Sequence, residues 1–291
     1  MSWRVVVIQK RCKLDYKLGS IVVRDGEDEK RIHLDDVSVI MCATTAVSLT
    51  AYLLAEIAER KIKIIFCDNQ HNPTAELMPM YGHYISSGRI RQQVKWDDKT
   101  KGLIWQTITT RKIQNQASVL RKIGQDERAN MLDKFASEVT PGDETNREGH
   151  AAKVYFNSLF GLDFYRNSSD IRNAVLNYGY SILLSCFNRE IAACGYLTQL
   201  GLWHDNASNP FNLGSDLMET FRPIIDYFTY SCGFNEFAKE EKLAVVNLLN
   251  MRVKINNAEQ YLNNAIGIYV RSIFTAIEEK DISKIMDWYE L

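Results

Sequence analysis

The sequence predicts an α+β protein, with an N-terminal β-rich domain followed by a larger all-helical C-terminal domain. Runs of β-branched residues with closely spaced turns dominate the first part of the chain. From about His83 onward, apolar residues recur at the helical period and strand signals largely stop. We therefore place the β-rich domain at residues 1–85 and the helical domain at residues 100–291, with a linker or first helix at about 86–99.

The strands of the first domain follow from short apolar runs. They are expected at residues 3–9, 12–16, 21–23, 31–34, 37–41 and 61–67. Turns at residues 18–20 and 25–26 lie close together, which favours an antiparallel sheet or a sandwich.

One helix is expected within this domain. Thr44 or Thr45 is placed to cap it, and it would run to Arg60. Residues 37–55 carry no charge, but their periodicity changes midway, so they indicate a strand and then a buried helix instead of a membrane span. Residues 68–79 have the composition of a loop.

The second part of the chain shows a succession of helical patterns. Helices are expected to include residues 104–120, 131–137, 171–200, 213–230, 239–250 and 257–279. The first long apolar helix after the middle of the chain should stop at Gly201, and Pro223 should kink or interrupt the next one. Thr145 and Glu148 have the spacing of a capping box that opens a further helix.

Composition limits the classes of function. With 35 basic and 36 acidic residues the net charge is −1, so the total charge points to no polyanionic partner. Six cysteines at positions 12, 42, 67, 186, 194 and 232 include no CxxC pair, which argues against a zinc knuckle and favours reduced thiols in a cytoplasm. The N-terminal residues carry charges that a signal peptide would lack.

Acidic residues and one histidine suggest a metal site. Asp216 and Glu219 lie three residues apart on one expected helix and share a face, Glu148 opens another helix, and His204 lies in a loop. Carboxylate oxygens with one imidazole suit Mg²⁺ or Mn²⁺ better than zinc. Such an ion can polarise a phosphodiester and activate a hydroxyl or a water molecule.

Each of these residues also has a structural interpretation. Glu148 can complete the capping box with Thr145, Asp216 and Glu219 can complement a helix N-terminus, and His204 can satisfy a loop carbonyl. Spacing alone does not show that they converge. No P-loop, no GxGxxG after a strand and no GxSxG elbow is present, so nucleotide hydrolysis and serine-hydrolase chemistry have no support.

Positive charge is concentrated between residues 89 and 122. Nine cations and two acids give this segment a net charge of +7. It would follow a phosphate backbone as a helical face, although a solvated surface is an equally good interpretation. The candidate DNA-binding residues are Arg89, Arg91, Lys95, Arg111, Lys112, Arg121 and Lys122.

Three segments together resemble a known family. They read EGHAAKVYF at 148–156, NYGYSILL at 177–184 and GLWHDNASNPFNLGSDLMETFRP at 201–223. In order and wording they are similar to the CRISPR-associated spacer-acquisition integrases, the first-numbered proteins of the Cas series, and most similar to the type II branch. The resemblance implies a site made by Glu148, His204 and Glu219, with Asp216 as a direct ligand or a supporting residue. Many members have Asp where this chain has Glu219, so the closer acid stays open.

The resemblance also implies an activity and its partners. The 3′-hydroxyl of a spacer-precursor duplex would attack a phosphodiester of a CRISPR repeat, with Mg²⁺ or Mn²⁺ as cofactor, and water in its place would make the site a nuclease. The partners would be double-stranded DNA, a second copy of the chain bound through the β domain, and a small ferredoxin-fold adaptation subunit. A noncatalytic DNA- or protein-binding scaffold is the alternative. An enzyme acting on a small phosphorylated substrate is less natural given the basic segment.

Overall fold

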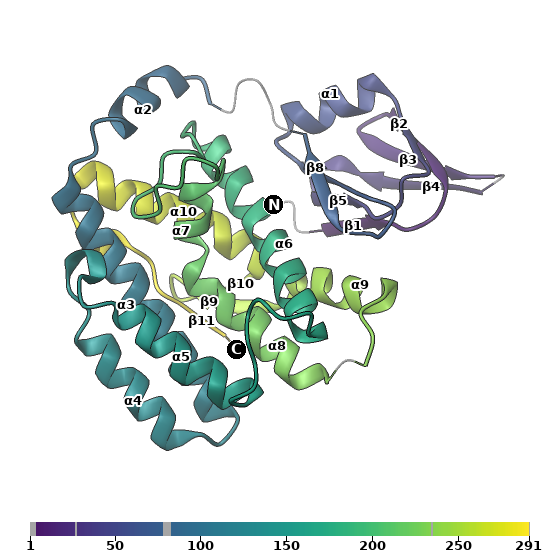
Figure 1. Ribbon diagram of the computed structural model, residues 1–291. Coiled ribbons are helices and arrows are strands. Elements are labelled where there is room, and N and C mark those ends of the chain that lie inside the picture. Colours follow the sequence, from purple (N-terminus) through teal and green to yellow (C-terminus); the bar gives the residue numbers. More distant parts are fainter. Residues whose placement is uncertain (1–3, 27, 78–82, 234, 291) are drawn as a thin grey trace.

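Two four-stranded sheets form the N-terminal part of the protein (Figure 1). The structure is a computed structural model that describes residues 4–26, 28–77, 83–233 and 235–290. One sheet contains, in spatial order, β1 (Arg4–Ile8), β5 (Val37–Cys42), β7 (Lys63–Cys67) and β8 (Pro73–Glu76). The other contains β4 (Asp28–His33), β3 (Ser20–Asp25), β2 (Cys12–Lys17) and β6 (Val47–Leu49). The 3₁₀ turn η1 (Leu34–Asp36) and the helix α1 (Ala51–Glu59) complete this part.

These sheets are mixed, which corrects the expectation of an antiparallel arrangement. β5 pairs in parallel with both β1 and β7, and β6 pairs in parallel with β2. A parallel connection needs a crossover, and α1 lies between β5 and β7 along the chain. Every residue of β5 is buried, as expected for the centre of a parallel sheet.

Two local expectations in this part are wrong. Neither Thr44 nor Thr45 caps α1, because β6 uses the intervening residues to pair with β2, and Thr50 caps the helix by accepting a hydrogen bond from Leu53 N at 3.3 Å. The segment expected as a loop contains β8, which pairs antiparallel with β7. Residue 3 of the expected strand and residues 78–79 of the expected loop lie outside the described residues.

Helices make up most of the remaining chain, so the predicted fold class is confirmed. The α-helices are α2 (Ser86–Gln93), α3 (Asp98–Lys122), α4 (Asp126–Ser137), α5 (Arg147–Phe160), α6 (Ile171–Ala193), α7 (Asn212–Leu217), α8 (Arg222–Cys232), α9 (Lys239–Asn247) and α10 (Leu262–Glu279). The 3₁₀ turns are η2 (Pro141–Asp143), η3 (Glu219–Phe221), η4 (Leu248–Asn250) and η5 (Ile282–Lys284).

The second part is not entirely helical, however. β9 (Arg252–Ile255), β10 (Ala258–Tyr261) and β11 (Trp288–Glu290) form a small antiparallel sheet. β10 and β9 are joined by Asn256 and Asn257, both at positive φ, so this segment turns back as a hairpin before α10 begins. The helix expected from residue 257 therefore starts five residues later, at Leu262.

Glycine and proline decide where two central helices stop. α6 ends at Ala193, with Cys194 as its C-cap, because Gly195 adopts a φ of +82°, so the expected continuation to Gly201 is wrong. Pro223 interrupts the next helix as predicted: α7, η3 and α8 follow one another, with Pro223 in the first turn of α8.

Helix α3 packs against α5 and η3, the two elements that carry Glu148 and Glu219. α3 packs against α4, α5, η2 and η3, and α6 packs against α7, α8 and α10 (Figure 1). The β part meets the helical part where α6 contacts β7 and β8. Over the ranges that the structure describes, no helix combines the length and apolarity needed to cross a bilayer.

Candidate metal centre

Glu148 projects from the first turn of α5 and takes no part in capping that helix. Asn146, in the left-handed conformation at φ +51°, caps it through a hydrogen bond from Gly149 N. The Asp143 carboxylate accepts hydrogen bonds from the backbone N–H groups of Arg147 and Glu148, at 2.8 and 2.9 Å. The capping box with Thr145 is therefore wrong, and the Glu148 side chain is free to reach α3.

Lys112 of α3 lies between two carboxylates. Its Nζ is 2.5 Å from Glu148 Oε1 and 2.5 Å from Glu219 Oε2. Burial disfavours charge on this amine, but the charges of Glu219 and Glu148 outweigh burial and raise the Lys112 pKa. The two acids are thus brought to one cation-binding position, from α5 and from η3.

Glu219 is held as an anion although it is 3% exposed. Burial alone would raise its pKa, but the charges of Arg222 and Lys112 lower it, and Arg222 Nη2 lies 2.9 Å from Glu219 Oε1. Glu219 Oε2 faces Lys112 as an ion pair without a hydrogen bond of regular geometry. A buried carboxylate oxygen that has only this charge contact is suited to a cation ligand.

Asp216 is buried and holds the His204 loop in place through hydrogen bonds. Asp216 has no exposed surface, and its two oxygens accept hydrogen bonds from the backbone N–H groups of Leu202, Trp203 and His204 at 2.6, 3.0 and 3.1 Å. Asp216 Oδ1 also lies 2.5 Å from His204 Nδ1. These four contacts occupy both oxygens and so favour the role of a supporting residue, while direct metal binding by Asp216 stays an untested prediction.

This contact defines how His204 can act. With Nδ1 donating to Asp216, the lone pair of the ring is on Nε2. The hydrogen bond to Asp216 raises the pKa of His204, burial opposes it, and the charges of Glu219 and Glu148 raise it further. The imidazole therefore lies within the electrostatic reach of both carboxylates, and the Trp105 ring meets it edge-on at 5.6 Å between centroids.

The loop that carries His204 is built by residues that sequence patterns did not identify. A Cβ on Gly201 would lie 2.3 Å from His204 O and 2.8 Å from Asp216 Oδ2, so only glycine fits there. Asn212 donates from Nδ2 to Gln199 O and Asn206 O, at 3.1 and 3.0 Å, and so closes the base of the loop. The segment at 201–223 contains Gly201, Asn212 and Asp216, but nothing in its local pattern showed these contacts.

A buried polar network lies behind Glu219. Arg222 packs over the Tyr180 ring at 4.6 Å, and the Tyr180 hydroxyl donates to Asp226. Burial raises the pKa of Asp226 to about 6, while the hydrogen bond from Tyr180 and the charge of Arg222 hold it below what burial alone would give. The network anchors the arginine that keeps Glu219 ionised.

The residues present fit a divalent cation. In the described chain no three acidic, histidine or cysteine side chains are close enough to enclose an ion as they stand, and Lys112 occupies the position between the two acids. Two carboxylates with one imidazole nitrogen nevertheless form an oxygen-rich donor set that suits Mg²⁺ or Mn²⁺. Glu148, Glu219 and His204 Nε2 would hold the ion.

Several cations of the basic segment are neutralised within the protein. Arg111 pairs with Asp287, and Arg121 pairs with Asp133. Lys112, 8% exposed, pairs with Glu148 in the candidate metal centre, and its expected contact with DNA stays an untested prediction. The net charge of +7 along the sequence therefore does not become an equally basic surface.

The remaining candidates divide between helices α2 and α3. Arg91 and Lys95 on and just after α2 are exposed, and so is Lys122 at the end of α3, whose amine lies 5.3 Å from the Tyr227 ring centroid. Arg89 turns inward, where its Nη1 donates to Cys194 O at 2.5 Å. Arg91 and Lys95 are thus the members of the set best placed to meet a ligand in solvent.

Comparison with known proteins identifies the family of this chain. Residues 5–244 match the family described as CRISPR associated protein Cas1. A CRISPR-associated endonuclease Cas1 of Neisseria meningitidis is 35% identical, over 78% of this chain and 74% of its own length. A casposase bound to an integration product superposes with a TM-score of 0.76 at 18% identity, covering 97% of this chain and 92% of its own. A partial Cas6-RT-Cas1–Cas2 complex gives a TM-score of 0.69 at 16% identity and covers all of both chains. The family match and the identity to the Neisseria protein, each over most of the sequence, show that this chain belongs to the Cas1 family.

Proposed function

We propose that the protein is a divalent-metal-dependent DNA integrase and endonuclease of CRISPR adaptation. The observation that supports this best is the convergence of Glu148 and Glu219, from separate elements, on one cation-binding position beside His204. The names of its relatives point the same way, since one is an endonuclease and another is a casposase bound to an integration product.

The reaction proposed is a transesterification. The oxygen of an incoming 3′-hydroxyl forms a bond to a repeat phosphorus, the existing P–O bond breaks, and a new 3′-hydroxyl leaves. Mg²⁺ or Mn²⁺ bound here would polarise the phosphodiester and lower the pKa of the attacking hydroxyl. Water in place of the hydroxyl gives hydrolysis by the same site.

The protein side chains have separate tasks in this reaction. Glu148 and Glu219 supply the negative charge that holds the cation, and Arg222 keeps Glu219 ionised. His204, with Nδ1 bound to Asp216, presents Nε2 as a ligand or as a proton acceptor. Lys112 must leave its position when a cation enters, because one position between two carboxylates does not hold both.

Partners are proposed by the same reasoning. A structural neighbour is part of a Cas1–Cas2 complex, so we propose that this chain joins a small ferredoxin-fold adaptation subunit and binds double-stranded DNA. We also propose that residues 1–85 form the dimerisation domain and residues 100–291 the catalytic domain, with α2 within the connecting segment. Sedimentation across a range of concentrations should give the mass of a dimer, and a monomer throughout would contradict this assignment.

One assay separates integration from a noncatalytic scaffold. The protein and its small partner are incubated with a 3′-hydroxyl duplex and a supercoiled plasmid that carries a repeat, with Mn²⁺ or with EDTA. Joined product that requires metal supports the integrase, whereas DNA binding without joining supports the scaffold.

Variants identify the residues involved. Glu148→Gln or Glu219→Gln should abolish joining and leave DNA binding nearly unchanged, because the acids hold the cation and the DNA contacts lie elsewhere. Glu144→Gln, an exposed acid on the segment before α5, is the matched control and should join normally. Full joining by either site variant in Mn²⁺ would count against the proposed centre.

A further inference from the structure

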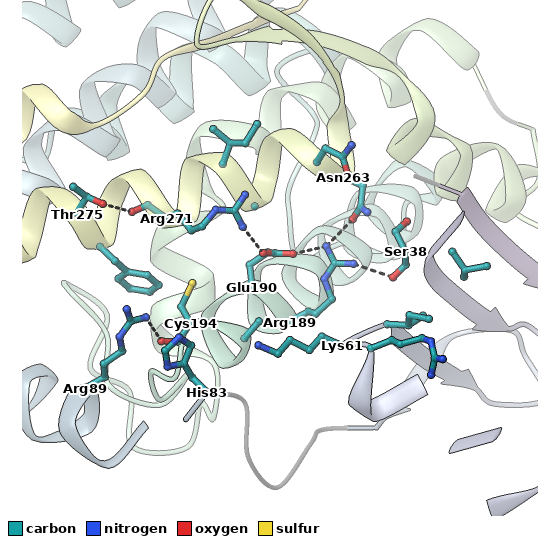
Figure 2. A pocket seen from close by; sticks show the side chains of 18 of the residues that line it. Ser38, Lys61, His83, Arg89, Arg189, Glu190, Cys194, Asn263, Arg271 and Thr275 are labelled. Atoms are coloured by element: carbon teal, nitrogen blue, oxygen red, sulfur yellow. Dashed lines mark hydrogen bonds and ion pairs between the residues drawn. The ribbon is translucent and has the colours of Figure 1, made fainter. Parts of the chain in front are cut away.

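A cavity lies between the β part and the helical part of the protein. Its volume is about 590 Å³, within the range of ligand-binding pockets. β5, the end of α1, α2, α6 and α10 all contribute to its lining (Figure 2). None of Glu148, His204 and Glu219 is among its lining residues, so it is separate from the candidate metal centre.

The lining of this cavity is strongly basic. Two carboxylates, Glu190 and Glu278, face a larger number of cations. The cationic side chains in the lining are Arg60, Lys61, Arg89, Arg189 and Arg271. The excess of positive charge favours an anionic ligand.

Internal pairing neutralises Arg60, which forms an ion pair with Glu56 outside the lining, but it leaves an excess of positive charge on the other cations. One carboxylate, Glu190, serves two arginines, with contacts of 2.5 Å to Arg189 and 3.3 Å to Arg271. Arg89 is held by Cys194 O at 2.5 Å and by the Tyr196 ring at 5.4 Å, neither of which carries a full negative charge. Arg271 is also 57% exposed, so it can turn toward a ligand at little cost.

The cavity wall is fixed by contacts that would not need to change on binding. Arg189 Nη1 donates to Ser38 O of β5 at 2.9 Å, which ties the two parts of the protein together (Figure 2). Asn263, 1% exposed, is part of the lining, and its buried Nδ2 has no acceptor among the described residues. A preformed wall with an unmet donor lowers the cost of binding an acceptor.

His83 also lines this wall. Burial lowers its pKa, and the charges of Arg89 and Lys61 lower it further. Figure 2 shows His83, Arg89 and Lys61 together in the lower part of the cavity, which places these two cations on one side of it.

We propose that this cavity binds a phosphate group of a single-stranded nucleic acid or of a free nucleotide. Arginine forks and a lysine are the side chains that recognise phosphate oxygens best. Because the site is separate from the metal-binding residues, it holds its ligand without metal and without any strand joining. Binding would also bridge β5 and α10, and so would stabilise the contact between the two parts of the protein.

The test uses the full-length protein in EDTA, which removes any contribution of the metal centre. The variant is Lys61→Gln with Arg271→Gln; Arg271 is more than half exposed, Lys61 is exposed, and both replacements are polar, so folding should be retained. The control is Arg252→Gln, an arginine of β9 that is 63% exposed, pairs with Glu259 and lies outside the cavity lining. Binding of a fluorescein-labelled oligodeoxythymidylate is followed by anisotropy at several salt concentrations. Thermal shifts are measured with inorganic pyrophosphate and with thymidine monophosphate.

The double variant should bind the oligonucleotide about tenfold more weakly. Its salt slope should be lower by about 1.4, as expected when two phosphate contacts to a single strand are lost. Arg252→Gln should behave as the unchanged protein does. If pyrophosphate or the mononucleotide stabilises the unchanged protein and not the double variant, a free nucleotide is the ligand; if only the oligonucleotide distinguishes them, a strand is. Equal affinity, salt slope and thermal shifts in the double variant and the control would overturn the proposal, whatever the outcome of the joining assay.

Discussion

Replacing Lys112 with methionine tests whether the two site acids form a cation-binding position. Methionine keeps most of the volume and the apolar stem of the buried lysine but removes its charge. Glu148 and Glu219 would then face each other without the amine that lies 2.5 Å from each. Glu219 keeps Arg222 at 2.9 Å, whereas no other ion pair to Glu148 is found in the described part of the chain.

The structure gives the magnitude of this change. Removing one partner of a buried ion pair costs about 3–5 kcal/mol. We expect the lower end, about 3 kcal/mol, because Arg222 still compensates Glu219 and the Glu148 side chain is 26% exposed. For a protein of this size such a loss lowers the melting temperature by roughly 6–12 °C in EDTA.

Divalent metal should reverse the effect. In the unchanged protein an entering ion has to displace the amine, whereas in Lys112→Met it meets two unpaired carboxylates. An ion at a hundredfold excess over its Kd stabilises by about 2.7 kcal/mol, so Mn²⁺ should restore most of the loss. The Kd for Mn²⁺ should be lower in the variant than in the unchanged protein.

Calorimetric unfolding with EDTA or Mn²⁺, together with Mn²⁺ binding followed by electron paramagnetic resonance, measures both quantities. The matched control is Lys101→Met on the same helix, where the lysine is 29% exposed and pairs with an Asp98 that is 97% exposed. That change should alter stability by less than about 1 kcal/mol and leave Mn²⁺ binding unchanged. A Lys112→Met protein that matches the control in both measurements would refute the assignment of this position.

Three further predictions concern other parts of the protein. Burial raises the pKa of Asp226 from 3.8 to about 6, so the folded state binds an extra proton and the free energy of unfolding should fall as pH rises from about 4 to 6. In urea titrations, Asp226→Asn should remove up to about 3 kcal/mol of this fall. An unchanged dependence on pH would disprove the attribution to Asp226. Gly201→Ala should destabilise the protein by about 2–4 kcal/mol and reduce joining, because the new methyl group meets the His204 loop. Gly88→Ala on α2 has open space and should be neutral or stabilising by about 0.5–1 kcal/mol. Equal stability of the two variants in denaturant would contradict this reasoning. Arg91→Gln with Lys95→Gln should lower the salt slope of duplex binding by about 1.8, and a slope equal to that of the unchanged protein would remove these residues from the interface.

The sequence by itself determined the order of the architecture. Runs of β-branched residues with closely spaced turns came first, and apolar residues at the helical period followed. These local patterns were sufficient to predict strands first and helices afterwards. It also predicted the interruption at Pro223, because proline acts on the backbone of its own turn. The parallel pairing of β5 and the short strand β6 were missed because strand partners are chosen by contacts between distant segments.

For the candidate site, too, the sequence and the tertiary structure contributed different information. Residue types and the resemblance of three segments to a known family suggested Glu148, His204 and Glu219 as a group, but not their geometry. Only the tertiary structure showed that Lys112, 36 residues before Glu148, lies between the two acids. It also showed that Asp216 accepts hydrogen bonds from the backbone of the His204 loop. The pairing of Arg111 with Asp287 joins residues 176 positions apart, and so the basic segment lost charge to partners that no local pattern contains. Periodicity and capping depend on neighbours within one turn, whereas the state of a buried charge depends on every element packed around it, and that is decided only when the chain folds.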